Sequence, residues 1–149
     1  MRTDFKERHK DNFWHEITSF GGYVFPFLVF LTFLALGNYD FAKKYFIGII
    51  LIYIVAFALR LIFFKPRPDK FKYDNFLEKL DASSFPSLHA ARATFVFLML
   101  SDFMQNTYFS ILAAVLVLLT CYSRIRFKRH DWKDVVAGIV LGILSSWAA

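Results

Sequence analysis

The stretch SRIRFKRHDWKD, residues 123–134, separates two apolar runs and carries the most informative polar residues of the chain. Ser123 and Arg124 are followed by His130 after five residues and by Asp134 after three more. On a helix that begins just after His130, residues four apart share a face, so we expect Asp134 beside the imidazole. A carboxylate there would fix the ring tautomer and stabilise its cation, and arginine is well suited to phosphate. The pattern indicates attack of a histidine on a phosphate group.

The composition is that of an integral membrane protein. Of the 149 residues, 57% are hydrophobic and 20% aromatic, a content that soluble domains of this length rarely carry. The runs without charge are 20–36, 45–59, 93–101, 107–123 and 135–149. Several of them approach the roughly 20 residues that cross a bilayer core. We therefore expect one membrane-embedded domain over residues 1–149.

The expected fold is all-α, a polytopic membrane bundle with five transmembrane helices and an amphipathic interfacial helix at the N-terminus. The transmembrane helices are expected at residues 20–37, 43–64, 87–104, 107–125 and 131–149. Pro26 interrupts the first, which neighbouring helices tolerate in lipid. Residues 3–18 place five apolar or aromatic side chains on one side, as interfacial helices do: Phe5, His9, Phe13, Trp14 and Ile17. A polar connection over 65–85 is expected to contain a short helix at 74–81.

Antiparallel neighbours bring the polar ends of four expected helices to one face of the membrane. Of the 18 Lys and Arg residues, 15 fall on that face, so the positive-inside rule favours a cytoplasmic site. A site that binds an anion also requires basic residues, so their number on this face is weaker evidence for its orientation. The net charge of +6 in a membrane protein favours a phosphorylated lipid or a membrane surface as partner, and not nucleic acid.

Three motifs lie in order along residues 60–134. They are Arg60 with Arg67-Pro68, then Pro86-Ser87-Leu88-His89, then Ser123-Arg124 with His130 and Asp134. This arrangement resembles the tripartite signature of the phosphatidic-acid phosphatase type 2 superfamily, in its integral-membrane lipid phosphatase branch. The sequence departs from the family pattern at Arg60, where the family usually has lysine, and at Leu88, where it usually has glycine.

The resemblance implies a role for each motif residue. His130 would be the nucleophile that forms a phosphohistidine, Asp134 would fix its tautomer, and His89 would be the general acid. The expected phosphate ligands are Arg60, Arg67, Ser87, the Leu88 N–H and Arg124. Four further residues are secondary candidates: Arg92, Ser123, Lys65 and Lys128. Arg92 lies in apolar surroundings one turn after His89, where its charge requires either a carboxylate or a phosphate. No metal ion and no cofactor is expected.

The implied activity is a metal-independent lipid phosphatase, and hydrolysis of an acid anhydride is also compatible with the chemistry. The resemblance is greatest to bacterial lipid A 1-phosphatases, with undecaprenyl diphosphate and phosphatidylglycerophosphate as alternative substrates. It implies a multi-pass protein of the bacterial inner membrane whose active site faces the periplasm. A non-catalytic membrane protein that ligates metal or haem through histidine, or a lipid carrier, is the alternative from another class. The oligomeric state stays open.

Overall fold

The computed structural model describes residues 2–67 and 74–149, and these ranges contain seven helices and no strand element. The helices are α1 (Arg2–Ser19), α2 (Val24–Ala35), α3 (Tyr39–Ile62), α4 (Phe76–Ala82), α5 (Leu88–Met104), α6 (Thr107–Arg126) and α7 (Trp132–Ala148). The all-α prediction is confirmed, and most bounds agree within a few residues. Pro68 of the first motif lies outside the described residues, as do the side chains of Phe5 and His9.

Polar caps determine where the long helices begin. The side chains of Asn38, Ser87, Asn106 and Asp131 accept hydrogen bonds from backbone N–H groups in the first turns of α3, α5, α6 and α7. Such caps satisfy donors that have no partner within the helix. The short connections that carry Asn38, Asn106 and Asp131 join α2 to α3, α5 to α6 and α6 to α7, and the helices of each pair contact one another.

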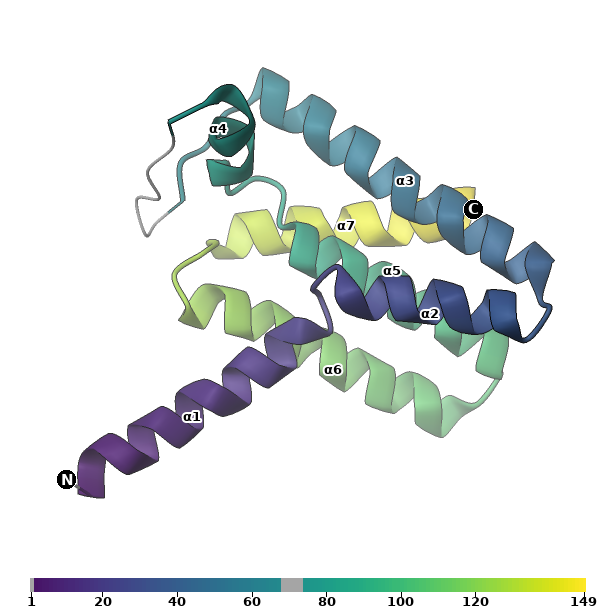
Figure 1. The fold of residues 1–149 in the computed structure, drawn as a ribbon, viewed down its shortest axis with the longest axis horizontal. Coiled ribbons are helices and arrows are strands. Elements are labelled where there is room, and N and C mark those ends of the chain that lie inside the picture. Colours follow the sequence, from purple (N-terminus) through teal and green to yellow (C-terminus); the bar gives the residue numbers. More distant parts are fainter. Residues whose placement is uncertain (1, 68–73) are drawn as a thin grey trace.

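The central helix is α5, which contacts α3, α6 and α7 (Figure 1). Its closest approach is to α7, where Gly138 and Gly142 lie one turn apart. A Cβ atom at Gly138 would lie 2.4 Å from the carbonyl oxygen of Ser87, and one at Gly142 would lie 2.5 Å from that of Ala91. Glycine at both positions therefore lets the two backbones touch, as small residues do between membrane helices. This glycine seam joins the start of α5 to the start of α7.

The outer surface of the bundle is apolar. Ile54 is 59% exposed, Leu118 64% and Leu144 53%. A large exposed apolar surface of this kind requires a partner such as lipid. Among the described residues, α3 and α6 are long and apolar enough to cross a membrane, and a segment formed by residues 11–19 and α2, bent by 41°, would be a third.

The count of five transmembrane helices is not confirmed. Helices α5 and α7 have 17 residues each, which corresponds to about 26 Å of helix against a hydrocarbon core of about 30 Å. The first expected helix is also shorter than predicted, because Gly21 and Gly22 separate α1 from α2 and only Val24–Ala35 is helical there. Membrane character is thus clear from α3 and α6, while α2, α5 and α7 are at or below the usual length of a transmembrane helix.

Four helix ends converge as the motif spacing predicted. The C-terminal ends of α3 and α6 and the N-terminal ends of α5 and α7 lie on one side of the bundle (Figure 1). The connection around Lys65 runs beside the segment that precedes α5, where the Ser84 N–H donates to the Lys65 carbonyl at 2.7 Å. This pairing brings the first motif next to the second.

Candidate active site

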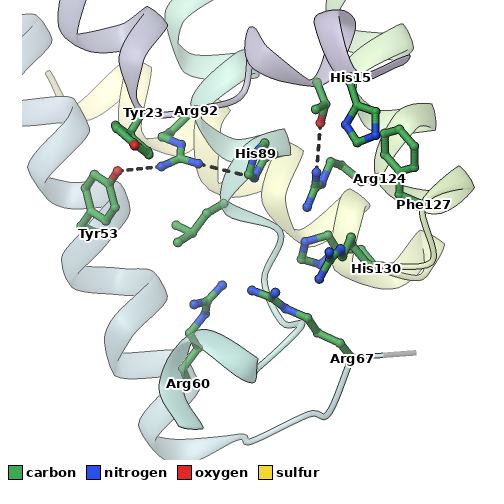
Figure 2. Close-up of a pocket in the computed structure, with 13 residues that line it drawn as sticks. His15, Tyr23, Tyr53, Arg60, Arg67, His89, Arg92, Arg124, Phe127 and His130 are labelled. Atoms are coloured by element: carbon green, nitrogen blue, oxygen red, sulfur yellow. Dashed lines mark hydrogen bonds between the residues drawn. The ribbon is translucent and has the colours of Figure 1, made fainter. Parts of the chain in front are cut away.

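A cavity of about 630 Å³ opens at this end of the bundle (Figure 2). Seven of the predicted site residues line it: Arg60, Arg67, Leu88, His89, Arg92, Arg124 and His130. The three motifs therefore meet in one cavity, and both imidazoles belong to it. Three residues from the N-terminal part of the chain, His15, Thr18 and Tyr23, complete the lining together with Tyr53, Phe127 and Arg129.

His130 lies in the connection between α6 and α7 and is only 4% exposed. Its Nδ1 lies 2.7 Å from the carbonyl oxygen of Ser84. Because a carbonyl can only accept, Nδ1 carries the proton and the lone pair is on Nε2. Burial and the positive charge of Arg124 lower the pKa of His130 to about 3, although the bond to Ser84 acts in the opposite direction. The ring is therefore a neutral imidazole at physiological pH, the form in which its nitrogen is nucleophilic.

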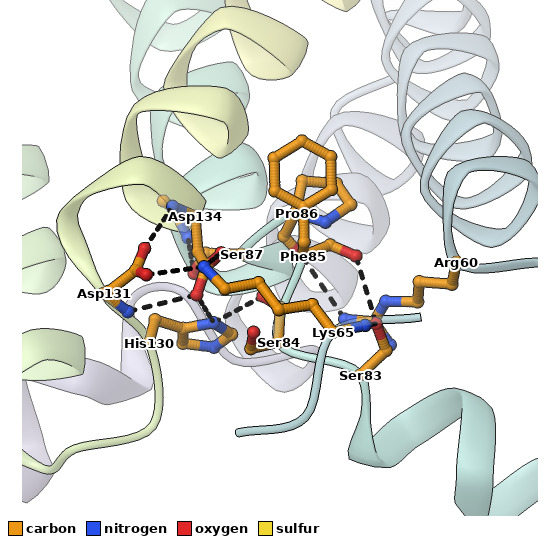
Figure 3. A network of polar contacts seen from close by, with 11 residues as sticks. Arg60, Lys65, Ser83, Ser84, Phe85, Pro86, Ser87, His130, Asp131 and Asp134 are labelled. Atoms are coloured by element: carbon orange, nitrogen blue, oxygen red, sulfur yellow. Dashed lines mark hydrogen bonds and ion pairs between the residues drawn. The ribbon is translucent and has the colours of Figure 1, made fainter. Parts of the chain in front are cut away.

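Asp134 lies beside His130, as the four-residue spacing predicted, but it is too far from the ring for a hydrogen bond. Its Oδ2 lies 4.0 Å from Nδ1 of the imidazole, beyond hydrogen-bonding distance. That oxygen accepts from the Asp131 N–H at 3.0 Å instead, and the Asp134 N–H bonds the Asp131 carboxylate in return. The reason is that His130 precedes the N-cap of α7, so its side chain follows the loop and not the helical repeat. The hydrogen bond that fixes the tautomer comes from the Ser84 carbonyl (Figure 3).

Lys65 lies between two carboxylates and does not line the cavity. Its Nζ donates to Asp134 Oδ1 at 2.7 Å and to Asp131 Oδ2 at 2.5 Å (Figure 3). Partial burial alone would lower the pKa of Lys65, but these two carboxylates raise it above its ordinary value. The ammonium group therefore stays charged and neutralises Asp134, which is fully buried. Its position favours a structural role over the phosphate contact considered from sequence.

The three motif arginines approach the cavity from different elements (Figure 2). Arg60, at the end of α3, donates from Nη1 to the Leu80 carbonyl at 3.1 Å and from Nη2 to the Pro86 carbonyl at 3.3 Å. Arg124, at the end of α6, donates from Nη1 to the Thr18 hydroxyl at 3.0 Å. Guanidinium groups held by such bonds present a fixed positive field to a tetrahedral anion.

His89 occupies the first turn of α5, with Arg92 one turn further along. Arg92 Nη2 lies 3.5 Å from His89 Nδ1, and the same guanidinium donates to the Gly21 carbonyl at 2.9 Å and to the Tyr53 hydroxyl at 2.7 Å. Because arginine has donors only, Nδ1 of His89 accepts and a neutral ring carries its proton on Nε2. The partners of Arg92 are thus a carbonyl, a hydroxyl and an imidazole, and not the carboxylate that we considered.

Five predicted residues lie outside the cavity lining: Asp134 and Lys65, described above, and Ser87, Ser123 and Lys128. Ser87 is fully buried, where its hydroxyl caps α5 and its N–H donates to the Asp134 carbonyl at 3.0 Å. Ser123 is also buried and donates to the Thr120 carbonyl at 2.6 Å. Lys128 is exposed in the turn after α6, where it adopts a φ of 53°. Their geometry supports caps and turns, and no contact with phosphate is needed to explain them.

The structure also reveals contributors that sequence reasoning missed. The role of the Ser84 carbonyl has no sequence signature, because every residue has a backbone carbonyl. Thr18 and His15 precede the motifs by more than 40 residues, so spacing gave no indication of them. The glycine seam could have been found, since Gly138 and Gly142 are four apart in an apolar helix.

Comparisons with known proteins identify the family of the chain. The family model described as the PAP2 superfamily matches residues 41–149. The chain is similar to the crystal structure of Aquifex aeolicus LpxE, with a TM-score of 0.77 and 23% sequence identity. That likeness covers 93% of this chain and 83% of the other. No curated protein matches the sequence. Since the family model covers well over half of the residues and includes all three motifs, the chain belongs to the PAP2 superfamily and is a phosphatase.

Proposed function

We propose that this protein removes a phosphate from a membrane lipid through a phosphohistidine intermediate. The observation that carries the proposal is that two imidazoles with opposite hydrogen-bonding surroundings line one arginine-rich cavity. His130 offers a lone pair at Nε2, and His89 offers a proton at the same ring atom. A nucleophile and a proton donor are the two groups that cleavage of a phosphate ester requires.

In the first step, Nε2 of His130 would attack phosphorus while the bond to the lipid oxygen breaks. His89, protonated once the phosphate dianion is bound, would donate that proton from Nε2 to the leaving oxygen, which departs as an alcohol and leaves His89 neutral. A phosphate monoester carries a charge of about −1.5 to −2 near neutral pH. Arg60, Arg67 and Arg124 would hold its other oxygens and stabilise the charge that develops on them.

In the second step, water would attack phosphorus and break the bond to Nε2 of His130. His89 would accept the proton of that water, so both histidines return to their starting states and inorganic phosphate is released. The Ser84 carbonyl keeps the His130 proton on Nδ1 while positive charge develops on the ring. Asp134, at 4.0 Å, would stabilise that charge through space.

A neighbouring groove supports a lipid as the substrate. It has a volume of about 570 Å³ and is lined by residues of α3, α4 and the start of α5: Tyr53, Ile54, Ala56, Phe57, Ala58, Arg60, Leu61, Leu80 and Leu88. Apart from Arg60 and the hydroxyl of Tyr53, these side chains are apolar. Three of the residues, Tyr53, Arg60 and Leu88, also line the phosphate cavity. A molecule with an anionic head and a hydrocarbon tail would fill both spaces at once.

Among lipids, we propose lipid A 1-phosphate, because the motifs and the compact bundle resemble enzymes of that type. Undecaprenyl diphosphate and phosphatidylglycerophosphate are the alternative substrates. We further propose five membrane crossings in the bacterial inner membrane, with the site on the periplasmic face. On that face the enzyme would meet lipids after their transfer across the membrane.

The test is release of phosphate by the purified protein in detergent from the three lipids, offered separately at equal concentration. We expect release from lipid A 1-phosphate at the highest kcat/KM, inhibition by vanadate and indifference to EDTA. Brief reaction with a ³²P-labelled lipid should yield an acid-labile, base-stable labelled protein. Release from none of the three lipids would refute the proposed function, and loss of activity with EDTA would refute the metal-independent mechanism.

A further inference from the structure

The N-terminal helix forms one wall of the phosphate cavity, although it lies outside the family match that starts at residue 41. His15, Thr18 and Tyr23, from the last turns of α1 and the connection to α2, belong to the cavity lining. The three motifs supply the opposite walls. The cavity is therefore completed by a part of the chain that carries none of the motif residues.

Contacts with α6 fix the position of this wall. Ile17 is buried, and its carbonyl accepts from the Thr120 hydroxyl at 3.3 Å. The Trp14 ring lies 5.0 Å from that of Tyr122, and Asp11 forms a 3.1 Å ion pair with Arg126. The last three turns of α1 thus follow the end of α6 that carries Arg124. A side chain on this part of α1 has a defined distance to that arginine.

Thr18 makes the contact that matters for the chemistry. Its hydroxyl accepts from Nη1 of Arg124 at 3.0 Å, and the arginine is only 8% exposed. A hydrogen bond to one nitrogen of a planar guanidinium sets the rotation of the whole group, because its donors form a rigid fork. Both residues line the cavity, so this bond bears on which edge of the guanidinium would face a phosphate bound there.

We propose that Thr18 is a positioning residue that orients Arg124 toward the phosphate, which makes the N-terminal helix a working part of the site. This inference rests on the proposed phosphatase function. A purely structural role, in which the hydroxyl only holds α1 against α6, makes a different prediction. It would change thermal stability and leave phosphate affinity and turnover intact.

The experiment compares Thr18→Val, which keeps the shape and removes the acceptor, with Thr18→Ser, which keeps the hydroxyl. The matched control is Ser19→Ala, because the Ser19 hydroxyl is exposed and donates to the His15 carbonyl within its own helix. Measured quantities are kcat, KM, the inhibition constant of vanadate and the melting temperature in detergent. We expect Thr18→Val to lower kcat/KM and weaken vanadate about 10-fold, as loss of a hydrogen bond to a charged group does. Thr18→Ser and the control should stay within about 2-fold of the wild type.

A double-mutant cycle separates the two roles. In an Arg124→Gln background, Thr18→Val should cause no further loss of kcat/KM, because the group that it orients is gone. Equal losses in both backgrounds, or a lower melting temperature with unchanged kinetics, would overturn the inference. Should Thr18→Val fail to fold, Thr18→Ala replaces it in the same cycle. Should the wild type release no phosphate, the proposed function fails by itself, and vanadate binding, measured as a shift in melting temperature, still tests the orientation of Arg124.

Discussion

The two histidines of the cavity are the same residue type in opposite settings. His130 is held in a buried network of loop residues, where its Nδ1 donates to the Ser84 carbonyl. His89 stands on a regular helix, where its Nδ1 faces a donor, the Arg92 guanidinium. One neutral ring therefore presents a lone pair at Nε2 and the other presents a proton there. In the proposed mechanism, the atom that is hydrogen-bonded to Nδ1, and not the residue type, divides the chemical roles of the two histidines.

The contacts that hold the two histidines in place differ as well. The network around His130 joins three connections through Lys65, Asp131 and Asp134, and a change in any one of them affects the others. The support of His89 consists of one helix and one arginine that reaches Gly21 and Tyr53. We expect the His130 side to tolerate substitution less well, since its geometry depends on loops that these contacts help to hold in place.

The largest effect is expected for His130→Ala. Removing the nucleophile should lower kcat by about 10,000-fold or more for every substrate, whatever its leaving group. Binding of lipid should persist, because the arginines stay. Phosphate release and lipid binding, measured on the same preparation, check this. Substantial residual turnover would mean that His130 does not form the covalent bond.

A smaller and selective effect is expected for His89→Ala. Loss of the proton donor should lower kcat by about 100- to 10,000-fold for a lipid phosphate, whose alkoxide leaves poorly. With an aryl phosphate, which needs little protonation to leave, the loss should be much less. A ratio of rates for the two substrates, compared with that of the wild type, checks the role. An equal loss for both substrates would remove the distinction between the two histidines.

For Lys65→Met we expect an intermediate loss, about 10-fold in kcat, although this residue does not touch the cavity. The variant leaves the buried Asp134 carboxylate without its ammonium partner, which disturbs the start of α7 beside His130. Lys133→Met, an equal change of charge on the exposed side of the same helix end, is the matched control and should have no effect. Similar kinetics in the two variants would show that the network does not support the nucleophile.

The smallest effect concerns stability at acidic pH. The pKa of His130 is lowered to about 3 in the folded protein, against about 6.5 in an unfolded chain. Between these values the unfolded state binds more protons at this position, so its contribution to stability is complete above pH 6.5 and decreases as the pH falls. From pH 6.5 to 5.5 the loss is about 1 kcal/mol. Melting temperatures of His130→Asn should therefore fall less over this interval than those of the wild type, and parallel curves would contradict the shifted pKa.

Much of the fold was predictable because its signals are local. Charge-free runs of 15 residues or more located α3, α6 and α7, and the polar caps at their starts are readable in the sequence. The convergence of the motifs followed from antiparallel connectivity alone. The boundary between the N-terminal helix and the next was predicted at residues 18–20, but α2 begins four residues later than expected, after Gly21 and Gly22, because hydropathy does not register a turn between apolar residues.

The site was predictable at the level of side chains that carry charge, and less so at the level of their contacts. The arginines and both histidines line one cavity, and antiparallel helix ends on one face are what brings them together. Asp134 lies near His130, but its Oδ2 stays 4.0 Å from Nδ1, because the four-residue rule applies inside a helix and His130 precedes one. The Ser84 carbonyl and the Thr18 hydroxyl escaped notice because a backbone oxygen or a distant threonine forms no pattern.

The direct contact of backbones along Gly138 and Gly142 also restricts how enzymes of this architecture can diversify. No side chain can be added at that contact without moving the second and third motifs apart, so the width of the cavity is invariant on that side. Acceptance of larger or smaller headgroups must therefore evolve on the walls made by α1 and α3, where side chains and not backbones face the ligand.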